Sequence, residues 1–139
     1  MKGCSEQPIH RLIGEEIPGV AVRAIRGAIQ VDANDRDQIL TGTAELVTAV
    51  LRRNDVDPSD LISIVFTATP DLTAEFPAYA ARLMGLSDVP LLCTTEIAVP
   101  GSMPRVLRLL AHVESGRPRS EIRHVYLAGA AALRTDLPQ

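Results

Sequence analysis

Arginine dominates the chemically active side chains of this sequence. Of its 14 basic residues, 13 are Arg and one is Lys, and the planar guanidinium binds carboxylates and phosphates through two parallel hydrogen bonds. Genomic base composition is an equally simple source of this bias. The polar residues that fall on predicted strands or near predicted helix ends are Arg26, Arg82, Glu96, Arg108, Tyr126 and Arg134. Such a set would suit the binding of a small anion.

Templates for metal or phosphate chemistry fit the sequence poorly. The glycines lack the spacing of a phosphate-binding loop. His10, His112 and His124 form no pair at the spacing of metal ligands on a helix. We therefore expect no metal site and no cofactor.

The cysteines also offer little support for covalent catalysis. Cys4 and Cys93 lie far apart without ligand spacing, so neither a disulfide nor a zinc site is predicted. Cys93 and His124 could form a nucleophilic pair, but nothing in the sequence orients the histidine. A small cysteine buried on an apolar strand is the commoner arrangement. These features favour a reducing compartment.

Charge and hydropathy exclude several partners. The net charge of -3 and the lack of a basic run argue against nucleic acid. No segment has the length of a signal peptide or membrane span, so a cytoplasmic protein without membrane contact is expected.

Residues 1–19 carry Gly, Pro and mixed charges without periodicity, which predicts a flexible N-terminal extension. Residues 20–139 would form one domain.

The first half of that domain divides into three predicted elements. Residues 20–31 alternate like a strand and put Arg26 on the opposite face to Ile25. A capping-box pattern begins a helix over residues 35–54. Residues 62–69 form a largely buried second strand.

The second half continues this alternation. Pro77 begins a shorter helix that Gly85 closes, and residues 89–97 form a third strand. A third helix is predicted from Ser102, with Pro104 in its first turn. Its apolar stripe consists of Met103, Val106, Leu107, Leu110 and Val113.

Arg108 lies off this stripe, and residues 122–134 read as a final extended segment interrupted at Gly129. Strands and helices thus alternate along the whole domain. This order predicts an α/β domain in which helices cover one sheet.

Four segments resemble, in order and spacing, the signature segments of the AroH-type chorismate mutases, a class of small bacterial enzymes. They are RAIRGAIQV, TATPDLTAEFPA, VPLLCTTEI and IRHVYLAGAAALRTDL. The resemblance covers about residues 20–137. It implies an α+β fold with a mixed sheet covered by helices, and a homotrimer with a pseudo-barrel core and active sites at the subunit interfaces.

The resemblance also implies a reaction, the rearrangement of chorismate to prephenate in phenylalanine and tyrosine biosynthesis. Its implied catalytic residues are Arg108 at the ether oxygen, Arg26 at a carboxylate and Glu96 at the substrate hydroxyl. Residues implied to bind the substrate are Tyr126, Arg134, Phe76, Ala78, Arg82, Leu92 and Cys93. No covalent intermediate is implied.

Tyr79 departs from the family pattern, because relatives often carry a lysine there, near the mouth of the site. Two other functions stay open. One is an imine deaminase-like enzyme of similar trimeric fold, which also holds a carboxylate with an arginine. The other is a binding module that keeps the fold and pocket without catalysis. The ATPDL, EFPA and RHVYL segments favour the mutase.

Overall fold

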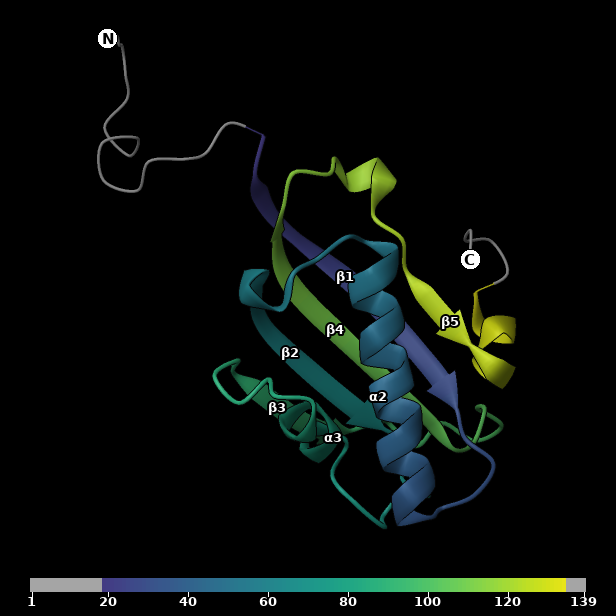
Figure 1. Ribbon diagram of the computed structural model, residues 1–139. Helices are drawn as coiled ribbons and strands as arrows, with labels where there is room; N and C mark the ends of the chain where they lie inside the picture. The colour runs from purple at the N-terminus through teal and green to yellow at the C-terminus, as the bar shows by residue number, and fades with distance from the viewer. Residues whose placement is uncertain (1–18, 135–139) are drawn as a thin grey trace, which may run out of the picture.

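The computed structural model describes residues 19–134. Within this range, five strands form one sheet in the order β3-β2-β4-β1-β5 (Figure 1). The extension predicted over residues 1–19 lies outside the described residues, except for Gly19. The strands are β1 (Ala21–Gln30), β2 (Leu61–Ala68), β3 (Leu91–Thr95), β4 (Val106–Ser115) and β5 (Val125–Leu127).

β4 is the central strand of this sheet. It runs antiparallel to β1, where Ala28 lies opposite Arg108, and antiparallel to β2, where Thr67 lies opposite Arg108. The two edge strands run parallel to their neighbours, β3 to β2 and β5 to β1. The mixed sheet implied by the family resemblance is therefore confirmed.

The long helix α2 (Arg36–Arg53) begins as the sequence predicts. The Asp35 carboxylate accepts a hydrogen bond of 3.0 Å from the Gln38 N–H. The Gln38 side chain in turn accepts from the N–H groups of Asp32 and Ala33, at 3.0 Å each. These contacts satisfy main-chain donors that the start of a helix leaves without helical partners.

The shorter helix α3 (Pro77–Leu83) is also confirmed, with Pro77 in its first turn. The chain leaves it through Gly85, whose φ of +93° is readily adopted only by glycine. Three short 3₁₀ helices complete the described elements: η1 (Pro58–Asp60), η2 (Arg119–Glu121) and η3 (Ala128–Leu133).

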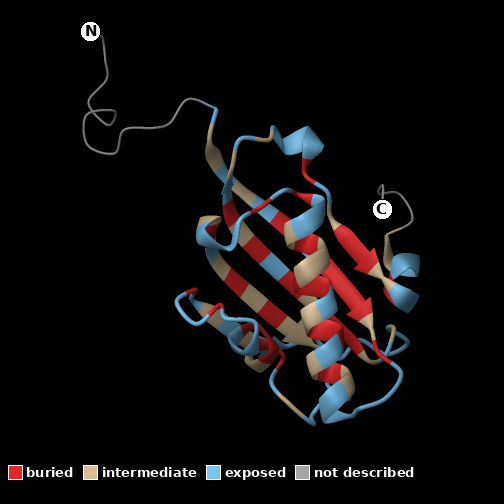
Figure 2. Ribbon diagram, viewed as in Figure 1, coloured by how far each residue is buried: buried red, intermediate tan, exposed pale blue. Residues whose placement is uncertain are grey.

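The main core lies between the sheet and the two α-helices. Ile25, Phe66 and Leu107 contribute from the strands, and Leu46 and Ala81 from α2 and α3. Figure 2 shows buried and more exposed residues alternating along the strands, as expected when only one face is covered. The helices α2 and α3 therefore cover one face of the sheet.

The opposite face of the sheet is largely uncovered in this chain. A small second cluster lies there, in which Ala130 of η3 packs with Ala28, Val106 and Tyr126. We call the sheet face opposite α2 and α3 the open face. Its side chains come from the strand positions that alternate with the main core.

The helix predicted from Ser102 is wrong, because residues 106–115 form β4. Buried residues recur there at every second position, which is the period of a strand: Leu107, Leu109, Ala111 and Val113. The neighbouring apolar residues imitate a helical stripe, but Leu110 is 36% exposed and faces the other way. Pairing with strands on both sides decides the conformation over local preference.

The final extended segment is also shorter than predicted. β5 ends at Leu127, and residues 128–133 form η3 instead of continuing to Arg134. The chain changes direction at Ala128, where φ is +53°, one residue before the predicted interruption at Gly129. β3 likewise covers only the middle of the predicted strand at 89–97.

Candidate active site

Arg108 projects from the middle of the central strand onto the open face. Its neighbours Leu107 and Leu109 are buried in the main core, so the alternation of the strand turns Arg108 away from the helices. Its cross-strand partners are Ala28 of β1 and Thr67 of β2. A strand, and not the predicted helix, thus positions this arginine.

Arg108, Glu96 and Thr67 form a compact polar group on that face. Arg108 Nε lies 2.7 Å from Glu96 Oε2, and the Thr67 hydroxyl donates a hydrogen bond of 2.6 Å to the same oxygen. The side chains of Arg108 and Glu96 are 40% and 20% exposed. The pair is therefore partly shielded but open to a ligand.

The contact between Arg108 and Glu96 is close without being well aligned. It counts as an ion pair, whereas the buried Nε makes no hydrogen bond of acceptable geometry within the described residues. A buried N–H in this position is costly to leave unpaired. Among the described residues, the ion pair with Glu96 is therefore the contact recorded for this buried Nε.

Glu96 is placed by the strand that precedes it. Its N–H donates to the Ala68 carbonyl at 2.9 Å, which continues the pairing of β2 and β3 beyond Thr95. Thr67 stands one residue before Ala68. The threonine was missed at the sequence level, although its place on β2 opposite Arg108 follows once β4 is known to be a strand.

The ATPDL segment fixes the start of β4. The Thr69 hydroxyl accepts from the Val106 N–H at 3.0 Å and donates to the Asp71 carboxylate at 2.5 Å. That carboxylate accepts from the Arg105 N–H at 3.0 Å, where φ is +55°. These contacts give the segment a structural role, since they set the strand that carries Arg108.

Arg26 and Tyr126 also lie on the open face. Arg26 alternates with Ile25 and Gly27 of the covered face and is exposed. Tyr126 lies opposite Ala28 across the parallel pair of β1 and β5 and is 5% exposed. The structure therefore brings four predicted residues onto one face, with Arg108 and Glu96 in direct contact.

The residues expected from the EFPA segment lie apart from this group. Phe76 is 69% exposed, Arg82 is exposed near the end of α3, and Ala78 is buried in the main core. On β3, Leu92 pairs with Val65 on the open face and is 59% exposed, whereas Cys93 packs against the main core. One chain alone does not gather all the predicted residues.

Arg36 organises the start of α3. Its Nε lies 2.8 Å from Glu75 Oε1, and its guanidinium carbon lies 5.6 Å from the centre of the Tyr79 ring. The N–H of Phe76 donates to Glu75, and this bond lowers the pKa of Glu75 from its ordinary value of 4.5 against the effect of burial, with Arg36 adding to the lowering. A cation therefore accompanies Tyr79, the position at which the family resemblance implies a lysine.

Arg134 lies at the end of the described residues and is half-buried. Its charge acts on His124, whose pKa is lowered by burial first and by Arg26 and Arg134 next. Whether Arg134 closes over a ligand remains a prediction from the family resemblance.

Residues 19–134 contain no group of three His, Cys, Asp or Glu side chains that could hold a metal ion. Over the same residues, the helices lack the combination of length and apolarity required to cross a membrane.

Together these features define a class of protein, an α/β domain that presents a paired arginine and glutamate on the open face of a mixed sheet. The model of the family "Chorismate mutase type I" matches residues 22–137. The chain belongs to this family, whose members are isomerases.

Individual relatives agree with the family match. The chain is similar to the chorismate mutase AroH of Thermus thermophilus, with 46% identity over 84% of this chain and 96% of the relative. It is 38% identical to the AroH protein of Bacillus subtilis strain 168, over 84% and 92% of the two chains. A solved chorismate mutase from Clostridium thermocellum aligns with a TM-score of 0.78 and 44% identity, over 79% of this chain and 98% of that one.

Proposed function

We propose that this protein converts chorismate to prephenate by positioning the substrate and stabilising charge. In this rearrangement a C–O bond breaks while a C–C bond forms, and no proton has to move. The enzyme must hold the reactive conformer with its two ends close together and offset the negative charge that grows on the ether oxygen. A preorganised cation suits both tasks.

Arg108 is the cation that carries this proposal. Its closest approach to Glu96 is through Nε, so the terminal nitrogens of the guanidinium remain to meet the ether oxygen and a substrate carboxylate. Glu96, which accepts a hydrogen bond from Thr67, pairs with the guanidinium on one side, and this preorganisation reduces the reorganisation needed when the transition state forms. The single supporting observation is this oriented group in a chorismate mutase fold.

The remaining residues take complementary roles. Arg26 and Tyr126 hold the carboxylate end of the substrate, and Glu96 accepts the substrate hydroxyl through its second oxygen. Arg134 closes the site from the C-terminal side. All of these roles follow the family resemblance, and the common face of Arg26, Arg108 and Tyr126 supports them.

The complete site lies between two subunits of a homotrimer. Support comes from the open face, where Val22 and Leu92 are each 59% exposed and Leu110 is 36% exposed. An apolar surface of this kind is typical of an interface. A neighbouring subunit would cover it and bring Phe76 and Arg82 to the Arg108 group, from which they are separated in one chain.

The domain spans residues 20–139, preceded by an extension, and works in the cytoplasm. The free thiol of Cys93 is compatible with a reducing compartment.

The test is a chorismate turnover assay with purified full-length protein in the presence of a chelator. Prephenate should form at a rate proportional to protein concentration, without added metal or cofactor. Tight binding of a chorismate transition-state analogue without turnover would contradict catalysis and support the binding module instead. Hydrolysis of amino-acid-derived imines without mutase activity would favour the imine deaminase-like alternative.

A further inference from the structure

His124 makes an unusual contact with the strand that carries Arg26. The Arg26 N–H donates a hydrogen bond of 3.0 Å to His124 Nδ1. β1 and β5 pair from Gly27 and Val125 onward, and Arg26 and His124 each stand one residue before that pair. The imidazole therefore takes the place of a main-chain carbonyl at the end of the ladder.

This contact specifies the protonation state of the ring. A nitrogen that accepts a hydrogen bond carries no proton, so Nδ1 is bare and the single proton of the neutral ring is on Nε2. In the cationic ring both nitrogens are donors, and Nδ1–H would then face the Arg26 N–H. Protonation of His124 and the contact with Arg26 exclude each other.

The surroundings of the ring favour its neutral form. Burial lowers the pKa of His124 from its ordinary value of 6.5, and the charges of Arg26 and Arg134 lower it further. The ring also lines a cavity of about 520 Å³ whose other polar lining residues are Arg23, Arg26, His112 and Arg119. Among the described residues, no carboxylate belongs to that lining, so none of them would stabilise an imidazolium there.

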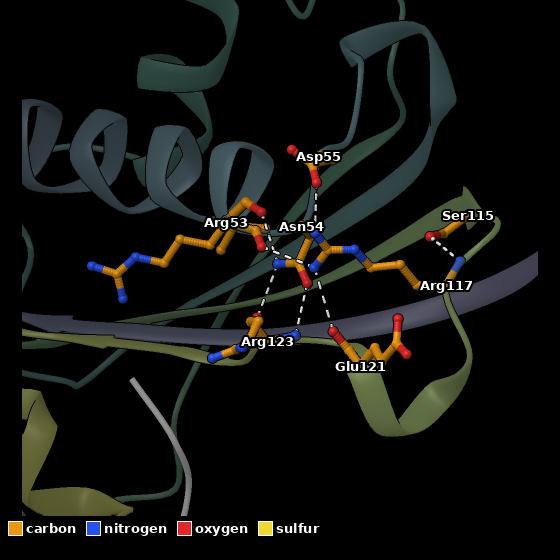
Figure 3. A network of polar contacts seen from close by, with 8 residues as sticks. Arg53, Asn54, Asp55, Ser115, Arg117, Glu121 and Arg123 are labelled. Carbon is orange, nitrogen blue, oxygen red and sulfur yellow. Dashed lines mark hydrogen bonds and ion pairs between the residues drawn. The ribbon is translucent and has the colours of Figure 1, made fainter.

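The segment that bears His124 is anchored from the other side of the sheet. Asn54, at the end of α2, accepts from the Arg123 N–H at 2.7 Å and donates to the Arg123 carbonyl at 2.9 Å. Figure 3 shows these bonds beside Arg117, which precedes Arg123 in the same loop and contacts the Asp55 carboxylate and the Arg53 carbonyl at the end of α2. Because Arg123 is held at both main-chain groups, the next residue has little freedom.

We infer that His124, as the neutral Nε2–H tautomer, is a positioning residue that fixes Arg26 and the register of the strand bearing Tyr126 for substrate binding. This inference rests on the proposed role of Arg26. The donor of the hydrogen bond is Arg26, a proposed substrate-binding residue. The acceptor, His124, lies two residues before Tyr126, which is another. Acid should therefore weaken substrate binding before it unfolds the protein.

The first experiment is a pH profile of kcat/KM for the wild type, His124→Asn and His124→Leu. The wild type should lose activity with one proton and a midpoint below 6.5, through a higher KM. Substrate carboxylates titrate near 4 and stay charged over most of this range. Asn can present an oxygen where Nδ1 stood, so His124→Asn should stay within about tenfold of the wild type and lose this acid limb.

His124→Leu removes the acceptor and should lower kcat/KM about 10- to 100-fold at neutral pH, as expected when a binding group is misplaced. His112→Asn is the matched control. His112 is also half-buried and lines the same cavity, but its Nδ1 lies 3.3 Å from the Ser63 hydroxyl, whereas the Arg26 N–H donates to His124. His112→Asn should still lose kcat/KM at low pH as the wild type does. If His112→Asn does not show this loss, the titration belongs to His112 and the inference is overturned.

A second measurement needs no variant. The ¹⁵N chemical shifts of the His124 ring in the intact wild-type protein should report a bare Nδ1 and a protonated Nε2 at neutral pH. A proton on Nδ1 would overturn the inference. So would an unchanged pH profile and KM in both His124 variants.

Arg26→Ala distinguishes a failure of the His124 inference from a failure of the proposed role of Arg26. If this substitution raises KM while the His124 variants have no effect, the proposed role of Arg26 stands and the inference fails. If Arg26→Ala has no effect on turnover, the role of Arg26 fails, and the inference fails with it because His124 has nothing to position.

Discussion

Glu96 receives two side chains at one oxygen, Arg108 from β4 and Thr67 from β2. This leaves its other carboxylate oxygen for a ligand hydroxyl. A hydrogen bond to a charged group contributes about 1.5 to 3 kcal/mol, so Thr67 should matter although it touches no substrate in the proposed mechanism.

Thr67→Val keeps the shape of the side chain and removes the hydroxyl. We expect kcat/KM to fall about tenfold, in line with the loss of one charge-assisted hydrogen bond. Steady-state kinetics on the folded variant checks this. Thr48→Val on α2 is the control, and equal losses in both variants would remove Thr67 from the site.

Only some of the candidate site residues could be predicted from the sequence. The arginines stood out by composition, and Arg26 could be assigned to the correct face of a strand from alternation alone. The roles of Arg108 and Glu96 came from the family resemblance, because no periodicity indicates that an arginine and a glutamate 12 positions apart meet. The sequence did not indicate the contacts that Thr67 and His124 make, since their partners come from other strands.

Among the elements, β4 is the one whose conformation could not be predicted from its local sequence pattern. Its consecutive apolar pairs fit a helix as well as a strand, and only its pairing with β1 and β2 selects the strand. α2, in contrast, has a capping box and a stable period within its own sequence. Elements whose conformation depends on distant strands are therefore the ones that sequence reasoning misses.

The end of α2 provides a test at this scale. Asn54 is 1% exposed, and its side chain makes three hydrogen bonds, two of them to Arg123 and one to the Val50 carbonyl. Asn54→Ala leaves these buried groups unpaired and should lower the free energy of unfolding by about 2 to 3 kcal/mol. Denaturant titration measures the loss.

Asn34→Ala is the matched control. Asn34 also makes three side-chain hydrogen bonds, to Thr73 and Ala74, but it is exposed, so water can replace them. Its loss should stay below about 1 kcal/mol. Equal destabilisation by the two substitutions would contradict the anchoring role of Asn54.

For the whole molecule, the sheet is covered on one side and largely open on the other. The class of fold followed from the order of elements, and the mixed sheet followed from the resemblance. The open face was not predictable, because the strand that forms its centre was expected to be a helix. The proposed trimer explains why an apolar face with Val22, Leu92 and Leu110 is left uncovered.

Leu110→Asp tests this assembly. A carboxylate in a subunit interface is costly to bury, so the variant should dissociate toward monomers and lose most of its activity, with both effects reduced at higher protein concentration. Light scattering and turnover are measured on the same samples. Thr41→Asp, on the exposed side of α2, should change neither, and an active Leu110→Asp monomer would contradict an interface site.

The central claim is the electrostatic role of Arg108, and its most direct test is kcat for the conversion of chorismate by Arg108→Ala beside Arg52→Ala, an exposed arginine of α2. Loss of a preorganised donor at developing charge costs about 10² to 10³ in rate. The account predicts a loss of at least about 10³ for Arg108→Ala, with the fold retained and Arg52→Ala at wild-type activity. A folded Arg108→Ala variant that keeps kcat within tenfold of the wild type would contradict it.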